Sequence, residues 1–247
     1  MIVISAGAFR AGSAWYFNMT NDLLIAAGKH DVRQIRDQYH LHNIMEGPNC
    51  NIGVMFYQKL LRFSSLHLRR KSFVVKTHAN PTRGLRVLTA LGVFQSTYIY
   101  RDPRDRIVSL LDIGKALREK GVGQRSGFDK VQTFEDALYW VRGARKQYDL
   151  WRQLPSTLVM RFEDLTLHTV PEMKRLSDFL GLGLTYEQVQ SVLQKYLNEQ
   201  VLVTEQSRTH YRRGNKVGRF KEVLTPEQIE RCHDYLDDDL RAMGYLG

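Results

Sequence analysis

The sequence has few cysteines and no long apolar run. Cys50 and Cys232 are the two cysteines among 247 residues, and they lie too far apart to suggest a metal site or a disulfide framework. Nowhere do 18 apolar residues follow one another, and the apolar stretch after Met1 is too short for a signal-peptide core. From the sequence alone we expect a soluble, unprocessed, cytoplasmic protein with no metal ion and no membrane partner.

The composition is that of an ordinary folded protein with excess positive charge. Hydrophobic residues make up 43% and charged residues 25% of the chain, and we take residues 1–247 as one domain. The formal net charge of +10 indicates an anionic partner, either a nucleic acid, an acidic membrane surface or a phosphorylated ligand. The longest basic runs, LRRK at 68–71 and YRRGNKVGRFK at 211–221, are too short to decide among these partners.

Short apolar segments alternate with longer amphipathic ones, which is the pattern of an α/β protein with parallel strands joined by helices. Strands are expected at Ile2–Ser5, Phe73–Lys76, Thr97–Arg101 and Thr157–Arg161. Helices are expected over residues 13–27, 103–117, 134–153, 170–180, 185–198 and 226–243. Capping sequences mark three of these helix starts, at 102–105, 133–136 and 225–228. Ligands of such sheets bind beyond the carboxyl ends of the strands, so functional residues are expected there.

The segment SAGAFRAGSAWYFN, from Ser5 to Asn18, joins the first strand to the first helix. Gly7 and Gly12 have the spacing of a phosphate-binding loop, but Ser-Ala follows where an ATP-binding loop has Lys-Ser or Lys-Thr. Backbone N–H groups and the helix dipole favour an anion at such a turn, and Arg10 adds a guanidinium. The loop therefore predicts an anion site that differs from an ATP site.

A second group of candidate residues lies in TYIYRDPRDRIVSLL. Arg101 ends a predicted strand and Asp102 caps the helix that follows, while Ser109 lies two turns along the same helix face. An arginine and a hydroxyl placed in this way can hold a second phosphate from two sides. Taken alone, the segment is more typical of a surface helix with ordinary ion pairs.

A third group lies at the end of the apolar segment FVVKTHAN. Lys76 and His78 are two residues apart, so their side chains point the same way in an extended strand. A histidine beside a cation should have a lowered pKa, which keeps it neutral and able to accept a proton near neutral pH. His78 is therefore the candidate general base.

Together these segments resemble the cytosolic-type sulfotransferases, which use 3′-phosphoadenosine 5′-phosphosulfate (PAPS) as donor. FRAGSAW at 9–15 is similar to the family's Pro-Lys-Ser-Gly-Thr-Thr-Trp loop, KTH at 76–78 to its Lys-Thr-His motif, and 101–109 to its 3′-phosphate signature. MRFEDL at 160–165 and RRGNKVGRFKEVLT at 212–225 resemble two later family segments, in family order. The resemblance covers nearly the whole chain and implies a single-domain, P-loop-NTPase-like sulfotransferase fold.

The resemblance implies a role for each matching residue. His78 is implied as the catalytic base, with Lys76 and Arg10 stabilising the transferred sulfonate, and Trp15 is implied to stack on adenine. The other implied contacts to the nucleotide are Ala11, Gly12, Ser13, Ala14, Arg101, Ser109, Phe162, Arg212, Arg213 and Gly214. The implied reaction carries a sulfonate from PAPS to a hydroxyl or amine of a small metabolite and releases 3′-phosphoadenosine 5′-phosphate (PAP), without a metal.

The sequence departs from the family at a few positions. Arg10 replaces a lysine, Ala14 removes one of two expected hydroxyls, and Pro226 interrupts the family's dimer segment, so a monomer or weak homodimer is expected. The glycine-rich segment 114–130 favours a mobile lid, with a plain connector as the alternative. Acceptor-pocket residues are expected within 30–70 and 112–132, which carry Tyr39, His40, Met45, Phe56, Tyr57 and Phe128.

Two other functions fit parts of the sequence. A nucleotide-dependent small-molecule kinase would share the glycine spacing of the first loop, but it needs the absent Lys-Ser or Lys-Thr pair. A non-enzymatic, basic nucleic-acid-binding protein would account for the net charge, but it leaves Lys76 and His78 without a role.

Overall fold

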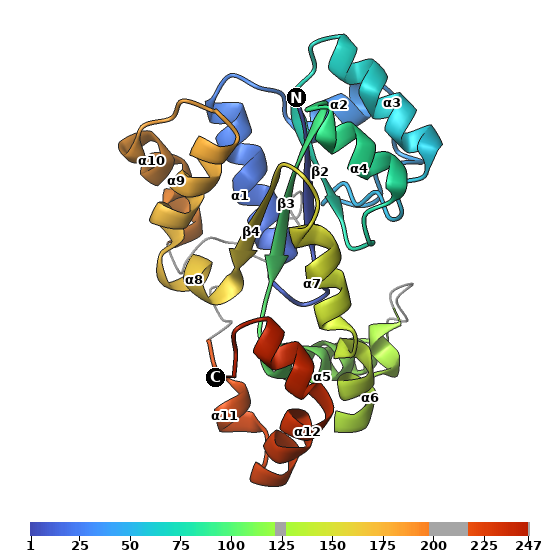
Figure 1. The fold of residues 1–247 in the computed structure, drawn as a ribbon, viewed down its shortest axis with the longest axis vertical. Helices are drawn as coiled ribbons and strands as arrows, with labels where there is room; N and C mark the ends of the chain where they lie inside the picture. Colours follow the sequence, from blue (N-terminus) through green and yellow to red (C-terminus); the bar gives the residue numbers. More distant parts are fainter. Residues whose placement is uncertain (122–126, 198–216, 247) are drawn as a thin grey trace.

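Four parallel strands form the central sheet of the protein (Figure 1). The computed structural model describes residues 1–121, 127–197 and 217–246. The strands are β1 (Ile2–Gly7), β2 (Phe73–Thr77), β3 (Phe94–Tyr100) and β4 (Thr157–Arg161), in the order β2-β1-β3-β4. In register, Ile4 of β1 lies opposite Val75 of β2 and Ser96 of β3. The expected α/β fold with a parallel sheet is confirmed, as are all four expected strands.

Helices cover both faces of the sheet, which explains why the strands read as nearly continuous apolar runs. One face packs against α1 (Ser13–Ala26) and α9 (Thr169–Phe179), and α10 (Tyr186–Leu197) packs on these two helices. The other packs against α3 (Tyr57–Leu68), α4 (Arg83–Ala90) and α7 (Ala144–Arg152), and α2 (Val32–Gln38) contacts the edge strand β2. No helix in the described parts of the chain combines the length and the apolar character needed to cross a membrane.

A second group of helices lies beyond the carboxyl ends of the strands, in the lower part of Figure 1. It consists of α5 (Pro103–Glu119), the short 3₁₀ helix η1 (Phe128–Lys130), α6 (Phe134–Val141), α11 (Phe220–Val223) and α12 (Pro226–Ala242). These helices bury a hydrophobic cluster of their own, separate from the core around the sheet. The short helix α8 (Phe162–Leu167) follows β4 directly and lies between the two groups.

Capping residues set the helix starts as expected. Asp102 accepts a hydrogen bond from the N–H of Arg104 at the start of α5, and Thr133 and Thr225 form capping boxes at α6 and α12. The single helix expected over 134–153 is wrong. The chain leaves the helix at Arg142 and passes through Gly143 at φ 75°, so α6 and α7 are separate helices.

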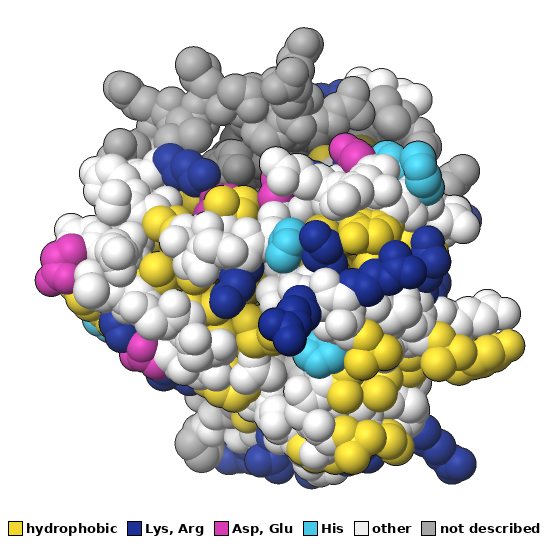
Figure 2. Space-filling view, turned by 90° about the horizontal axis from the view of Figure 1, so that it is seen from above, with side chains coloured by type: hydrophobic (Ala, Val, Ile, Leu, Met, Phe, Trp, Pro, Cys, Tyr) yellow, Lys and Arg dark blue, Asp and Glu magenta, His cyan; other side chains and the backbone are white. Residues whose placement is uncertain are grey.

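The sequence did not predict α2, α3, α4, α8 or α11. Each is a short helix of about three turns or fewer, and tertiary packing stabilises such helices more than propensity does. Figure 2 looks down on the end of the molecule that carries α2, α3 and α4. Lys and Arg side chains lie beside hydrophobic ones over the central part of this face.

Gly7, the last residue of β1, is required by close packing. A Cβ at this position would lie 2.6 Å from Cγ2 of Ile99 and 2.8 Å from Cβ of Ser13. A side chain at the β1–α1 junction would therefore push the first turn of α1 away from β3, which would displace the loop between them.

We predict that Gly7→Ala lowers the free energy of unfolding by about 1–3 kcal/mol, the usual cost of overpacking. Gly84→Ala is the matched control. Its Cβ would meet Cδ1 of Leu60 at 2.7 Å, the free end of a flexible side chain, and alanine is the better helix former in α4. Denaturant unfolding of both variants checks this, and equal stability of the two would contradict it.

Candidate active site

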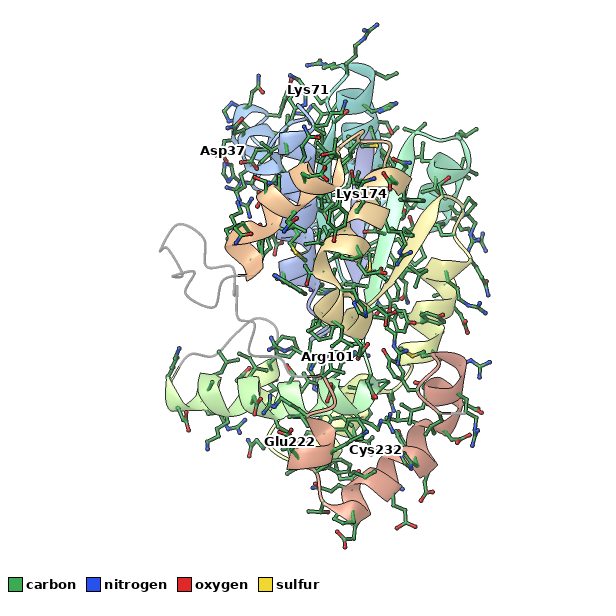
Figure 3. All side chains as sticks on the ribbon, turned by 90° about the vertical axis from the view of Figure 1, so that its left-hand side faces the viewer. Asp37, Lys71, Arg101, Lys174, Glu222 and Cys232 are labelled. Atoms are coloured by element: carbon green, nitrogen blue, oxygen red, sulfur yellow. The ribbon has the colours of Figure 1, made fainter. Side chains whose placement is uncertain are left out.

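A cavity of about 520 Å³ opens where β1 and β2 end, between the sheet and α5. Figure 3 shows Arg101 near the ends of these strands. It lies between the sheet with its helices and the group formed by α5, α11 and α12. The residues that line the cavity are Phe9, Arg10, Gly12, Ser13, Ala14, Trp15, Asn49, Lys76, His78, Ser109, Asp112, Ile113, Ala116, Phe128, Phe162, Thr166, Thr169, Tyr196 and Arg219.

The loop between β1 and α1 lines this cavity. Arg10 and Gly12 are both left-handed, at φ 64° and φ 76°, and no side chain caps the start of α1. A Cβ on Gly12 would lie 2.5 Å from Cε2 of Phe162, so this position has no room for a side chain. A helix N-terminus that is left uncapped beside a cavity is a site for an anion.

Arg10 connects this loop to α5. Its Nε donates a hydrogen bond to Oγ of Ser109 at 3.0 Å, while Nη1 of Arg101 donates to the backbone oxygen of Arg10 at 3.5 Å. Burial lowers the pKa of Arg10, and the charge of Arg101 lowers it further. The structure thus brings together Arg10, Arg101 and Ser109, which were predicted in two separate motifs. Arg10 and Ser109 line the cavity, whereas Arg101 is buried beside Arg10 and does not line it.

Arg101 is held by a buried ion pair. Its Nη2 lies 3.3 Å from Oδ2 of Asp105, and its guanidinium carbon lies 4.4 Å from the centre of the Phe162 ring. The Asp105 carboxylate also accepts hydrogen bonds from the N–H groups of Gly218 and Phe220, at 2.8 and 3.0 Å. Asp105 therefore fastens the turn before α11 to the arginine at the end of β3.

Lys76 and His78 face each other as the sequence predicted. Lys76 Nζ lies 2.5 Å from His78 Nε2, and His78 Nδ1 lies 2.7 Å from the carbonyl oxygen of Gly7. Since a carbonyl can only accept, Nδ1 carries the proton and Nε2 presents its lone pair. Burial lowers the pKa of Lys76 to about 7. The pKa of His78 falls to about 3, chiefly through burial and then through Lys76, so burial outweighs the neighbouring charge.

Aromatic side chains wall the cavity beside His78. The Phe9 ring stacks on the imidazole, with centroids 4.4 Å apart, and meets Phe128 and Trp140 edge-on. Phe128 was expected near an acceptor pocket, whereas Trp140 was not singled out. The expectation for Phe56 and Tyr57 is wrong, because both are exposed at the start of α3 and do not line the cavity.

Arg106 is a site residue that the sequence did not reveal. It is buried in α5, and its Nε donates to the carbonyl oxygen of Phe9 at 2.9 Å. Its Nη1 is buried without a hydrogen-bond partner, and burial lowers the pKa of Arg106. In the sequence, a cation three residues before Ser109 on a helix is an ordinary surface pattern. Only the fold shows that Arg106 contacts the β1–α1 loop.

The other predicted residues have mixed outcomes. Ser13, Ala14, Trp15 and Phe162 line the cavity, and the Trp15 ring meets Phe162 edge-on with centroids 6.4 Å apart. Ala11 is buried and does not line it. Arg212, Arg213 and Gly214 lie outside the described residues.

The expected lid segment, 114–130, is partly helical. Residues 114–119 complete α5, and a Cβ on Gly114 would lie 2.3 Å from the backbone oxygen of Val131, so η1 packs closely on α5. Residues 122–126 are outside the described part, and closure of a lid stays a prediction. Among the described residues, no group of three or more His, Cys, Asp or Glu side chains could hold a metal ion.

The fold and the cavity define a class: an α/β protein with an anion-binding strand–loop–helix and a lysine–histidine pair at the ends of parallel strands. Residues 3–244 match the family model described as the sulfotransferase domain. The chain therefore belongs to the sulfotransferase domain family, as the motifs had indicated.

Individual relatives are distant. The chain is 27% identical to Cytosolic sulfotransferase 17 of Arabidopsis thaliana over 175 residues. This match covers 60% of this chain and 50% of that protein. The chain thus spans about half the length of this curated relative.

Solved structures share the fold. Retinol dehydratase in complex with androsterone and inactive cofactor PAP aligns with a TM-score of 0.58 at 20% identity, over 97% of this chain and 80% of that one. Mouse sulfotransferase SULT7A1 complexed with PAP aligns with a TM-score of 0.53 at 14% identity, over 97% and 84%.

We predict that Asp105→Asn lowers the free energy of unfolding by about 3–5 kcal/mol, because it leaves Arg101 buried without its carboxylate. Asp112→Asn is the control. Asp112 pairs with Arg219 at 2.7 Å, but its side chain is 54% exposed, so its loss should cost at most about 1 kcal/mol. Denaturant unfolding compares the two, and similar losses would contradict the role of Asp105.

Proposed function

We propose that this chain transfers a sulfonate group from PAPS to a hydroxyl or amine of a small-molecule acceptor and releases PAP. The observation that carries the proposal is the Lys76–His78 pair, which opens into the same cavity as the uncapped start of α1 and Ser109, with Arg101 buried in contact with Arg10. Family membership supports it, and so do structural relatives described as complexes with PAP.

The cavity fits a nucleotide with two phosphate-like ends. The loop residues Arg10–Trp15 and the start of α1 would hold the 5′-phosphosulfate, while Arg101 and Ser109 would hold the 3′-phosphate. Trp15 and Phe162 line the adjoining wall and would contact adenine. Arg212, Arg213 and Gly214 are proposed from the motif alone to close over the 3′-phosphate.

Charge supports the fit as well. Arg10 and Arg101 lie side by side, and burial together with the charge of Arg101 lowers the pKa of Arg10. Asp105 pairs with Arg101, so an anionic group of the ligand would chiefly offset the charge of Arg10. In our proposal, donor binding also raises the pKa of Lys76 and of His78, since a nearby negative charge favours their protonated forms.

The proposed reaction is an in-line displacement. His78 Nε2 takes the proton from the acceptor as the acceptor oxygen or nitrogen bonds to sulfur, and the bond from sulfur to the bridging oxygen breaks. Lys76 and Arg10 stabilise the negative charge on the sulfonate and on the leaving phosphate oxygen. Lys76 would turn from Nε2 to these oxygens when donor is present, which frees the lone pair of His78.

The acceptor would lie against Phe9, Phe128 and Trp140, next to His78. This wall suits a small, polar or partly aromatic, natural-product-like metabolite. The rival functions have less support. A kinase loop would need a lysine and a hydroxyl at Ser13 and Ala14, and a nucleic-acid-binding role does not use a buried lysine–histidine pair. A cytoplasmic monomer or weak homodimer stays our prediction.

The nucleotide preference tests the proposal directly. In a thermal-shift assay PAP should raise the melting temperature, whereas ATP with magnesium and an oligonucleotide should raise it less. Transfer of labelled sulfur from PAPS across a metabolite panel then tests the reaction. A larger shift with ATP and no transfer to any acceptor would favour the kinase alternative.

His78→Ala should lower kcat by about 10²–10⁴-fold, the usual worth of a general base, with PAP affinity changed only a few-fold. His233→Ala is the matched control, since His233 contacts Arg104 near α12 and does not line the cavity. Turnover near that of the unaltered protein in His78→Ala would remove this residue from the mechanism.

The charge of Lys76 should make donor-site affinity depend on pH. Because burial lowers its pKa to about 7, the ammonium is present below that pH and is lost above it. The ratio of PAP dissociation constants, Lys76→Met over unaltered protein, should be largest near pH 6 and shrink toward about pH 9. Using the ratio cancels titration of the ligand's own phosphates. A ratio that is constant with pH would show that Lys76 does not titrate in this range.

A further inference from the structure

The outer surfaces of α3 and α4 expose apolar side chains in two stripes. On α3, Tyr57, Leu61 and Leu68 are spaced by four and seven residues and so share one face; Leu68 is 82% exposed. On α4, Val87 and Leu91 are four residues apart and also exposed. The opposite helix faces carry the buried residues, so these stripes are not part of the core.

The two helices form one surface because they pack closely. A Cβ on Gly84 of α4 would lie 2.7 Å from Cδ1 of Leu60 on α3. We name the outer side of α3 and α4 the α3–α4 surface; it comprises Tyr57, Leu61, Arg62, Leu68, Arg69, Arg70, Arg83, Arg86, Val87 and Leu91.

The charge of the α3–α4 surface has one sign. Residues 47–101 contain no Asp or Glu, although they contain lysines and arginines throughout. Arg69 and Arg70 are exposed next to Leu68, and no carboxylate in the described parts of the chain pairs with them. In Figure 2 basic and hydrophobic side chains share the central part of this end of the molecule, while acidic ones lie toward its margins.

We propose that the α3–α4 surface docks on an anionic lipid bilayer. The apolar side chains would enter the acyl boundary of such a membrane, while the neighbouring arginines would contact its acidic headgroups. A second copy of this chain would bring like charges together, and a nucleic acid would leave Leu61, Leu68 and Leu91 in water. The sequence alone led us to expect no membrane partner, and it did not predict α3 or α4.

Docking in this way leaves the active site open. The α3–α4 surface is on the upper right of Figure 1, and the cavity faces the lower group of helices. No residue of the surface lines the cavity, so the proposal is independent of the proposed reaction. It predicts a protein held at a membrane with its cavity accessible to acceptors in water or at the interface.

Vesicle flotation of the full chain tests this proposal. The protein should float with vesicles containing about one third phosphatidylglycerol at about 0.1 M salt, and not with pure phosphatidylcholine. Leu61→Ser with Leu68→Ser, and separately Arg69→Gln with Arg70→Gln, should each weaken partitioning at least about tenfold. Thermal shift with PAP should be unchanged in both, which shows that the variants fold.

The matched controls lie outside the α3–α4 surface. Leu167→Ser with Tyr139→Ser removes exposed apolar groups from α8 and α6, and Arg231→Gln with Arg241→Gln removes exposed charges from α12. Both controls should float like the unaltered protein. The proposal is overturned by absence of flotation with anionic vesicles, by equal loss in the controls, or by an α3–α4 surface that binds only an oligonucleotide or only a second copy.

Discussion

The site depends on cationic side chains that are buried together where the parallel strands end. Arg101, Arg106 and Lys76 expose 1%, 4% and 5% of their surfaces. Taking such charges out of water, and close to one another, costs free energy that the protein alone offsets incompletely. The lowered pKa values of Lys76 and Arg106 express this cost. In the proposed donor complex, a ligand that brings negative charge would lower this cost, which would link donor binding to folding stability.

The same cations fix the backbone of the anion-binding loop. The carbonyl oxygens of Gly7, Phe9 and Arg10 point to His78, Arg106 and Arg101 respectively, which come from β2, α5 and the end of β3. Each end of the loop is therefore tied to a different neighbouring element, while Phe9, Arg10, Gly12, Ser13, Ala14 and Trp15 line the cavity. The left-handed backbone of Arg10 is thereby held from three directions, as a strained position in a functional loop must be.

The sequence predicted what depends on local pattern. Apolar strands, capping residues and the lysine–histidine spacing are local, and the structure confirms them. The break at Gly143 was missed because the amphipathic pattern continues across it, and α3 and α4 were missed because their exposed faces are apolar. Arg106 and Trp140 could not be found, since their roles arise only when α5 and α6 fold against the β1–α1 loop.

The substitution of arginine for the family's loop lysine has a consequence that only the fold reveals. A lysine ammonium acts at one point, whereas the Arg10 guanidinium presents donors in a plane, and one of them already reaches Ser109 of the second phosphate motif. Arg10, Ser13 and Ala14 all line the cavity, where Ala14 leaves one hydroxyl fewer than the family pattern. In the proposed donor complex, the planar guanidinium of Arg10 would contact both the phosphosulfate and the 3′-phosphate, which the single ammonium of a lysine could not do.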